Sequence, residues 1–293
     1  MAVTSFTPRA LSFVSIPGYA NNVDVSGDYA YVAAGSSGLQ VVSVIDRNAP
    51  AIIGSYNTPG NANDVKVIGD RAYVADGTSG LEVFDVSTPN NPVLLGTADT
   101  PGEAQDVVII GDRAYVADGR GGLQVINVGN PVAPVVIGSV STSLEARGVD
   151  VSGNFAVVAI DKSTVYPAIG GAVVVDLSNE TNPRVTASIP LSGSKDVAVR
   201  DRLAYVAANS GGLQVIDFTD PVRPFMLSSL PGTPPDGFIP RDVKLFGRYA
   251  FAAEQLYNNV VPVLDLADPG APGAARPCQF HAARRLRGDG DRC

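Results

Sequence analysis

An aspartate recurs at one position of a repeated stretch, and it is the residue type in this sequence best suited to chemistry. The four copies are Asp64, Asp106, Asp196 and Asp242. Carboxylates gathered in a ring could bind a hard cation such as Ca²⁺, which could then serve as a Lewis acid. A polar residue repeated in every unit can equally be held by backbone N–H groups, as buried polar groups generally are. We favour the structural role and keep Ca²⁺ binding as the alternative.

The repeated part of the sequence has no histidine or cysteine, which most other catalytic and metal-binding sites require. The one histidine, His281, and the two cysteines, Cys278 and Cys293, stand together near the C-terminus. Nucleophilic triads need a base such as histidine, and zinc, copper and haem sites use nitrogen or sulfur ligands. The sequence also has no Gly-x-x-x-x-Gly-Lys-Ser/Thr loop for phosphates. We therefore predict that the protein is not an enzyme and takes no cofactor, with Ca²⁺ as the one alternative.

The aspartates head short apolar segments that repeat six times, beginning near residues 22, 64, 106, 148, 196 and 242. Each repeat has three strand-like segments, and a Pro-x-x-Pro turn leads to a fourth in most copies. The segments are nearly continuous apolar runs, which indicates that both faces of each sheet are covered. A period of about 40 to 50 residues with four strands is typical of a propeller blade. We predict an all-β protein, a β-propeller of four-stranded antiparallel blades, as a single domain over residues 8–272.

The number of strands predicts how the ring closes. Six sets of the first three segments are present, but no sixth closing segment is recognisable after Pro272. A strand-like run without partners, Arg9–Ile16, precedes the first repeat. We expect six blades, with this N-terminal strand completing the last one, because closure removes exposed sheet edges. A seven-bladed parent cut short at its C-terminus is the alternative. Residues 1–7 and 273–293 are expected to be disordered.

The third segment of each repeat resembles the LVIVD repeat family. It reads LEVFDV in Leu81–Val86, LQVIDF in Leu213–Phe218 and VVVDL in Val173–Leu177. The preceding Ala-Tyr-Val-Ala, the glycine-rich loop and the Pro-x-x-Pro turn also match, so the resemblance extends over about residues 9–272. It implies a β-propeller with no established catalytic activity, often part of bacterial and archaeal surface or secreted proteins. The fourth copy departs from the pattern, with Gly148 in place of the aspartate.

Charge and hydropathy make two classes of partner unfavourable. The net charge of −8 and the pI of about 4.6 disfavour nucleic acid. No apolar run approaches the roughly 18 residues that a membrane helix needs. We therefore expect a monomer that does not insert into membranes. The N-terminus lacks the features of a signal peptide. The compartment stays open, and only the family resemblance suggests an extracellular or cell-surface location.

Three insertions interrupt the regular repeats and mark a candidate binding face. They lie at Asp161–Gly171, Pro231–Arg241 and Glu254–Asn259, in the adjacent copies four to six. In a propeller, the loops after the second strands and the connections between blades emerge on the same face. Such insertions often form a binding surface, although loops also tolerate neutral insertions. The candidate ligand-binding residues are Asp161, Lys162, Tyr166, Phe238, Arg241, Glu254 and Tyr257.

These observations predict a non-catalytic binding, adhesion or scaffold module whose partner, a protein or a glycan, docks on that face. The alternative is a Ca²⁺-dependent propeller hydrolase or lyase that uses the repeated aspartates at the mouth of the channel. A purely architectural role within a longer surface protein is a third interpretation.

Overall fold

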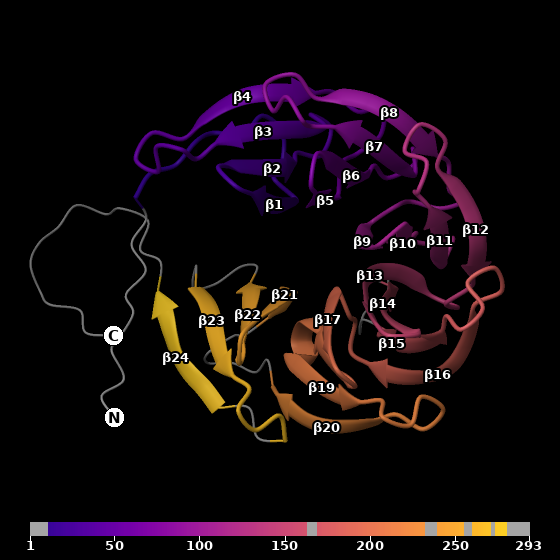
Figure 1. Cartoon of the computed structure of the whole chain (residues 1–293). Helices are drawn as coiled ribbons and strands as arrows, with labels where there is room; N and C mark the ends of the chain where they lie inside the picture. The colour runs from indigo at the N-terminus through magenta and orange to yellow at the C-terminus, as the bar shows by residue number, and fades with distance from the viewer. Residues whose placement is uncertain (1–10, 163–168, 232–238, 255–259, 271–272, 280–293) are drawn as a thin grey trace, which may run out of the picture.

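The structure is a computed structural model that describes residues 11–162, 169–231, 239–254, 260–270 and 273–279. Within them, six four-stranded antiparallel sheets surround a central channel, and the one helix is a 3-10 turn, η1 (Asn209–Gly211) (Figure 1). The chain is a six-bladed β-propeller, which confirms the fold predicted from the repeat. In the described part of the chain, no helix is long and apolar enough to cross a membrane.

Each blade runs outward from the channel in chain order, and we number the blades 1 to 6. The innermost strands are β1 (Asn22–Ser26), β5 (Asp64–Ile68), β9 (Asp106–Ile110), β13 (Glu145–Ser152), β17 (Asp196–Arg200) and β21 (Pro240–Phe246). The second strands are β2 (Tyr29–Ala33), β6 (Arg71–Ala75), β10 (Arg113–Ala117), β14 (Phe155–Lys162), β18 (Leu203–Ala207) and β22 (Tyr249–Glu254). The third strands are β3 (Leu39–Ser43), β7 (Leu81–Asp85), β11 (Leu123–Asn127), β15 (Ile169–Asp176), β19 (Leu213–Asp217) and β23 (Val260–Asp265). The outermost strands are β4 (Ala51–Tyr56), β8 (Val93–Ala98), β12 (Val135–Val140), β16 (Arg184–Leu191), β20 (Phe225–Leu230) and β24 (Gly273–Gln279).

Two glycine positions explain how the repeat folds locally. Gly69, in the turn between β5 and β6, has a φ of +58° and open space around it, so its backbone conformation alone requires glycine. Gly54, in the outer strand β4, is required for close approach instead. A Cβ there would lie 2.3 Å from the carbonyl oxygen of Pro89 in the next blade. The Pro-x-x-Pro turn of one blade is thus fitted against the outer strand of the blade before it.

The core lies between blades and not within one of them. At the first junction, Tyr31, Leu39 and Val41 of blade 1 pack against Val65 and Phe84 of blade 2. Equivalent apolar clusters occupy the next four junctions. Among the described residues, no such cluster joins blade 6 to blade 1, and Figure 1 shows the ring open on that side.

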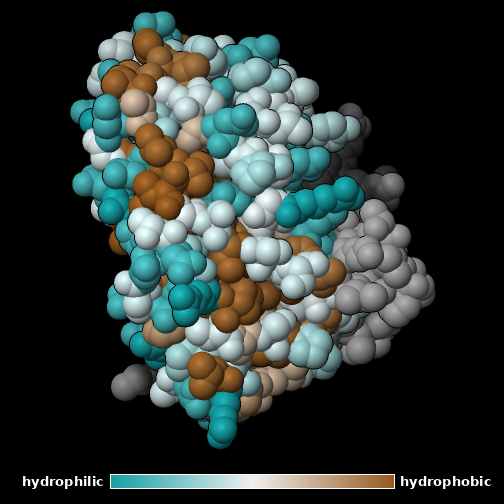
Figure 2. All heavy atoms as spheres, turned by 90° about the vertical axis from the view of Figure 1, so that its right-hand side faces the viewer, coloured by the Kyte–Doolittle hydropathy of each residue, from teal (hydrophilic) through white to brown (hydrophobic). Residues whose placement is uncertain are grey.

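The outer edge of the propeller is largely solvated. Most residues of the outer strands are exposed or half-buried, including the apolar side chains of Val135 in β12 and Val185 in β16. Figure 2 views this side of the molecule and shows apolar side chains interspersed with polar ones. Because these side chains are largely in contact with solvent, the sequence of an outer strand needs little hydrophobic patterning. Its backbone pairs with the third strand on one side only.

The prediction that Arg9–Ile16 completes the last blade is wrong. The fourth strand of blade 6 is β24, which pairs antiparallel with β23, and residues 11–16 carry no strand. Pairing with a strand that follows after a short turn closes a far smaller loop than recruiting the opposite end of the chain. The expectation that residues 273–293 are disordered is accordingly wrong for Gly273–Gln279. Residues 280–293 and 1–7 lie outside the described residues.

Candidate functional site

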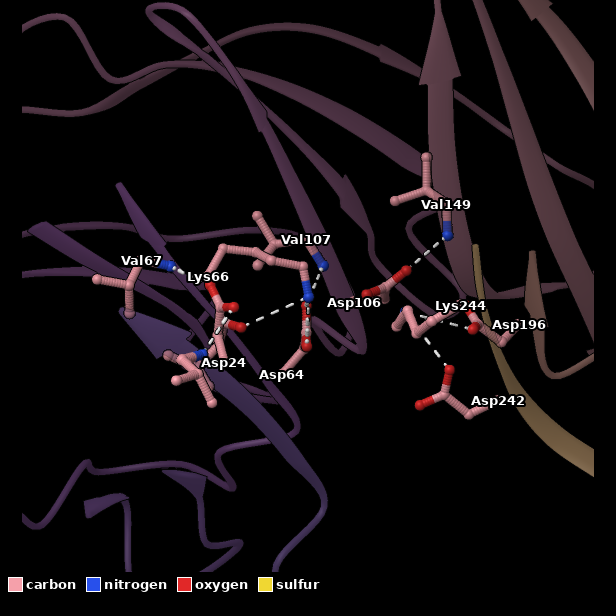
Figure 3. A network of polar contacts seen from close by, with 12 residues as sticks. Asp24, Asp64, Lys66, Val67, Asp106, Val107, Val149, Asp196, Asp242 and Lys244 are labelled. Atoms are coloured by element: carbon pink, nitrogen blue, oxygen red, sulfur yellow. Dashed lines mark hydrogen bonds and ion pairs between the residues drawn. The ribbon is translucent and has the colours of Figure 1, made fainter. Parts of the chain in front are cut away.

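The aspartates at the start of the inner strands join neighbouring blades. We call this place the head position; it is occupied by Asn22, Asp64, Asp106, Gly148, Asp196 and Asp242 in blades 1 to 6. Oδ2 of Asp64 accepts the backbone N–H of Val107, in the next blade, at 3.0 Å (Figure 3). The carboxylates of Asp64, Asp106 and Asp196 are buried, and each accepts a backbone N–H group of the following blade. The equivalent pairs are Asp106 with Val149 at 2.7 Å and Asp196 with Val243 at 2.9 Å.

Blades 1 and 4 make the same kind of contact from a different residue, which the sequence-based prediction missed. Oδ2 of Asp24, two residues beyond the head position, accepts the N–H of Val67 at 2.7 Å. Oδ2 of Asp150 does the same for Val199 at 2.6 Å. The signal was present in the sequence, because the two repeats without a head aspartate are those with an aspartate two positions later.

Packing explains why the aspartate is displaced in blade 4. A Cβ at Gly148 would lie 2.8 Å from both Cα and Oδ1 of Asp196 in the next blade. No side chain fits that approach without a shift of the backbone, so the head position of this blade excludes an aspartate. Asp150, two residues later, supplies the acceptor instead.

Lysines sit among the carboxylates of the ring. Nζ of Lys66 lies 3.0 Å from Oδ1 of Asp64. Nζ of Lys244 lies 3.4 Å from Oδ2 of Asp196 and 3.4 Å from Oδ1 of Asp242 (Figure 3). The ammonium groups of Lys66 and Lys244 therefore already supply positive charge beside the aspartates that were considered as Ca²⁺ ligands. Among the described residues, no group of three or more His, Cys, Asp or Glu side chains is placed to hold a metal ion.

Burial changes the protonation of this ring. It raises the pKa of Asp106 to about 7, with the nearby Asp64 carboxylate acting in the same direction. Burial also raises the pKa of Asp196 well above its ordinary value, against the opposing effect of Lys244. Burial opposes the charge of Lys244 too, but Asp196 and Asp242 raise its pKa above the ordinary range. At neutral pH the channel mouth is therefore less negative than its four aspartates suggest.

A second ring of polar residues, which we call the rim, precedes the head positions by one residue. It lies at the mouth on the same face as the loops after the second strands, because the start of each inner strand pairs with the end of the second. The rim and the head residues line a polar pocket of about 200 Å³. The rim is divided: blades 1 to 3 contribute amides and blades 4 to 6 contribute cations. Its members are Asn21, Asn63, Gln105, Arg147, Lys195 and Arg241.

Most rim side chains are anchored by neighbours. Nδ2 of Asn63 donates to the carbonyl of Ala104 at 2.8 Å, as Asn21 does to Ala62. Arg147 donates to Oε1 of Gln105 at 3.3 Å and pairs with Glu145. Lys195 pairs with Asp161. Arg241 differs, because its side chain makes no hydrogen bond or ion pair with the described residues, and its Nε is buried.

The candidate loop residues are distributed unevenly. Arg241 lies on the rim, as a site on this face requires. Asp161 is fully buried against Lys195, so the expectation that it contacts a ligand is corrected to a structural role. Lys162 and Glu254 end strands β14 and β22. Tyr166, Phe238 and Tyr257 lie outside the described residues.

The insertion in blade 4 extends its central hairpin. Strands β14 and β15 each have eight residues, whereas the equivalent strands of blades 1, 2, 3 and 5 have five. Their pairing continues to Lys162 and Ile169. The hairpin thus lengthens at the end where the rim lies, next to Lys195.

A buried glutamate in the third strand of blade 2, Glu82, has a raised pKa and lies outside the rim. Gln40, Gln124 and Gln214 occupy equivalent places in the third strands, and the amide of Gln124 donates to the carbonyl of Gly121 at 2.6 Å. Blade 2 has Glu82 at this place, with Oε2 buried and unpaired. Burial, followed by the charge of Asp76, raises the pKa of Glu82 to about 7. A protonated Glu82 can donate a hydrogen bond as the glutamines do.

The comparisons with known proteins agree on the architecture. A family model described as the LVIVD repeat matches residues 17–58, 59–100, 101–142, 145–189 and 193–230. Among curated proteins, no significant match is found.

Several solved structures share the fold at low sequence identity. A proposed 6-phosphogluconolactonase from Bacteroides uniformis superposes with a TM-score of 0.73 at 17% identity, over 92% of this chain and 89% of the other. A chain of the mitotic checkpoint complex gives 0.70 at 13% identity, over 97% and 90% of the two chains. The computationally designed Ika8 protein gives 0.65 at 12% identity, over 91% and 77%. Such identities establish the propeller fold alone.

Proposed function

This chain belongs to the LVIVD repeat family, and we propose that it is a non-catalytic binding module. Its partner, a protein or a glycan, docks at the channel mouth that carries the rim and the loops after the second strands. The observation that carries this proposal is Arg241, a rim residue whose buried Nε has no acceptor among the described residues.

The buried Nε of Arg241, on an otherwise half-buried residue, is a donor without a partner among the described residues. Leaving a buried donor without a partner costs about 1 to 3 kcal/mol, and more when the group is charged. An acceptor brought by a ligand would remove this cost. Arginine is also the side chain best suited to planar, bidentate recognition of a carboxylate or phosphate.

The charge of the rim favours an acidic partner. Arg147, Lys195 and Arg241 are contributed by three consecutive blades to one side of a single pocket. The amides of blades 1 to 3 complete the ring with groups that suit hydroxyl or peptide partners. Arg147 and Lys195 are paired with Glu145 and Asp161, so among the described residues Arg241 is the rim cation that would orient an approaching anion.

The extended hairpin β14–β15 supports the same location. It projects from blade 4 at the level of the rim, where it can form a wall beside the pocket. Binding residues commonly lie on loops that a rigid scaffold positions, and propeller mouths follow this pattern.

The Ca²⁺-dependent hydrolase or lyase has less support. Its carboxylates accept backbone N–H groups of the following blade or are paired with Lys66 and Lys244. A cation at the ring would have to displace these contacts. A non-catalytic function leaves these contacts of the carboxylates in place.

A binding screen tests the proposal. Polygalacturonate and polyglutamate serve as acidic probes and dextran as a neutral one, with the wild-type chain, Arg241→Ala and Arg223→Ala compared by biolayer interferometry. Arg223 is a matched control, because it is exposed in the turn between β19 and β20, at the outer edge of blade 5. We expect binding to an acidic probe that Arg241→Ala weakens and Arg223→Ala preserves. Preference for dextran, or equal loss in both variants, would contradict the proposed site.

A further inference from the structure

The junctions between blades always use the same two faces. We call the face that packs on the preceding blade the leading face; in blade 2 it includes Val65, Val67 and Phe84. The face that packs on the following blade is the trailing face; in blade 1 it includes Tyr31 and Leu39. All five observed junctions place a leading face on a trailing face.

In the described part of the chain, no blade lies against the leading face of blade 1, although Phe13, Val14 and Ile16 lie beside its outer part, where Val32 and Val42 are buried. Val23 and Val25 are 54% and 60% exposed, whereas their equivalents in blade 2, Val65 and Val67, are 0% and 8% exposed. Next to them, a groove of about 420 Å³ is lined by apolar residues that include Phe13, which is 92% exposed. Contiguous exposed apolar surface of this kind marks an interaction site in soluble proteins.

Among the described residues, no blade covers the trailing face of blade 6 either. Ala253 is exposed, although its equivalent in blade 2, Ala75, is completely buried. Asp242 holds the head position of this blade, yet it accepts no backbone N–H from a following blade in the described part of the chain. The donor that a closed ring would offer it is the N–H of Val23. Instead, Oδ1 of Asp242 lies 3.4 Å from Nζ of Lys244.

We propose that copies of this chain associate by docking the leading face of blade 1 in one molecule on the trailing face of blade 6 in the next. The two free faces are of opposite kinds, so each is the surface that the other is built to meet. The five internal junctions supply the pattern for the contact, including a hydrogen bond from the N–H of Val23 to Asp242 of the neighbouring copy. This proposal differs from the monomer expected from the sequence, and the experiment below distinguishes the two.

The geometry of this contact determines the form of the assembly. A contact between two different faces is heterologous, and it leaves one leading and one trailing face free at the ends of any open chain of copies. Association therefore continues beyond a dimer as the concentration rises. Internal closure of a single ring, which would bury both faces within one molecule, predicts a monomer at every concentration instead.

Two face-specific variants test the contact. Val23→Asp with Val25→Asp blocks the leading face, and Ala253→Asp blocks the trailing face. These side chains are exposed, so the substitutions leave the internal junctions untouched; circular dichroism checks the fold. Val222→Asp is the matched control, because Val222 is 60% exposed in a turn away from both faces. The molecular mass is measured by size-exclusion chromatography with light scattering over a hundredfold range of concentration.

The expected masses distinguish this contact from any other. The wild-type chain and Val222→Asp reach masses above twice that of the monomer as concentration rises. Each blocked variant alone remains monomeric, and an equimolar mixture of the two forms a dimer of twice the monomer mass and nothing larger. A wild-type chain that is monomeric throughout, or a mixture that stays monomeric, would overturn the proposal.

Discussion

Oδ2 of Asp106 lies 2.7 Å from the backbone nitrogen of Val149, across the junction between blades 3 and 4. A carboxylate makes the corresponding contact at each of the five junctions, twice from a residue two places further along. The inner strands of neighbouring blades belong to separate sheets, so no ladder of backbone hydrogen bonds joins them there. A side-chain acceptor crosses each of these junctions, and isolated backbone bridges such as Gly35 with Ala62 add to it at the first three. The repeated aspartates thus contribute to holding the ring together.

Removing one of these acceptors should weaken the ring. We expect Asp106→Ala to lower the free energy of unfolding by about 1 to 3 kcal/mol, because the N–H of Val149 is left buried without a partner. Urea denaturation followed by circular dichroism measures the change. Asp112→Ala, at an exposed turn of the same blade, is the control and should have little effect. Equal losses in the two variants would show that the contact does not stabilise the junction.

The head position of blade 4 should reject any side chain. Gly148→Ala places a Cβ 2.8 Å from Cα of Asp196, and the adjustment of two packed inner strands should lower the melting temperature by several degrees. Gly270→Ala is the control, since the closest atom to its Cβ is a side-chain oxygen of Asp268 at 3.3 Å. An unchanged melting temperature for Gly148→Ala would mean that blades 4 and 5 are packed less closely than described.

Glu82 should make stability depend on pH. Its pKa is raised from the ordinary 4.5 to about 7, so the folded state holds a proton that the unfolded chain releases. The resulting stability is complete below about pH 4.5 and is lost as pH rises towards 7. Over this range the loss reaches about 3 kcal/mol. Glu82→Gln removes this part of the pH dependence and should be more stable than the wild type at pH 8.

The comparison for Glu82 is a pair of unfolding curves at pH 5 and pH 8. Glu103→Gln, at an exposed position, should follow the wild type at both values. The difference between wild type and Glu82→Gln isolates this residue from the other buried acids. A difference that does not change between the two pH values would exclude a raised pKa at Glu82.

Calcium should not stabilise the protein. A ligand at a hundred times its dissociation constant stabilises the folded state by about 2.7 kcal/mol, which a melting experiment detects readily. Because Lys66 and Lys244 already neutralise the aspartate ring, we expect millimolar CaCl₂ to leave the melting temperature unchanged. An increase of several degrees that Asp64→Asn abolishes would favour the Ca²⁺-dependent alternative.

The blades were predictable because every copy repeats the same local chemistry. The apolar second and third strands, such as Ala72–Ala75 and Leu81–Val86, are buried on both faces and therefore carry a strong pattern. The outer strand is different. Gly273–Gln279 forms β24 without a recognisable sequence pattern, and its backbone pairs with β23.

The site was predictable in part. The structural role of Asp64 follows from its repetition, because buried carboxylates must find hydrogen-bond donors. The substitute acceptors Asp24 and Asp150 become apparent only when adjacent blades are seen side by side. The division of the rim into amides and cations was readable one position before each head residue. That these residues line a single pocket follows only from the arrangement of the blades around the channel. This arrangement brings Asn63 and Arg241 together although they are far apart in sequence.

The central claim is that Arg241 anchors an acidic partner at the channel mouth. Isothermal titration calorimetry with the tightest acidic probe of the screen tests it directly, on the wild type, Arg241→Ala and Arg223→Ala. A charge-assisted hydrogen bond is worth about 1.5 to 3 kcal/mol, so the account predicts that Arg241→Ala weakens affinity at least about tenfold. Arg223→Ala should bind as the wild type does. Equal affinity of all three proteins would contradict the account.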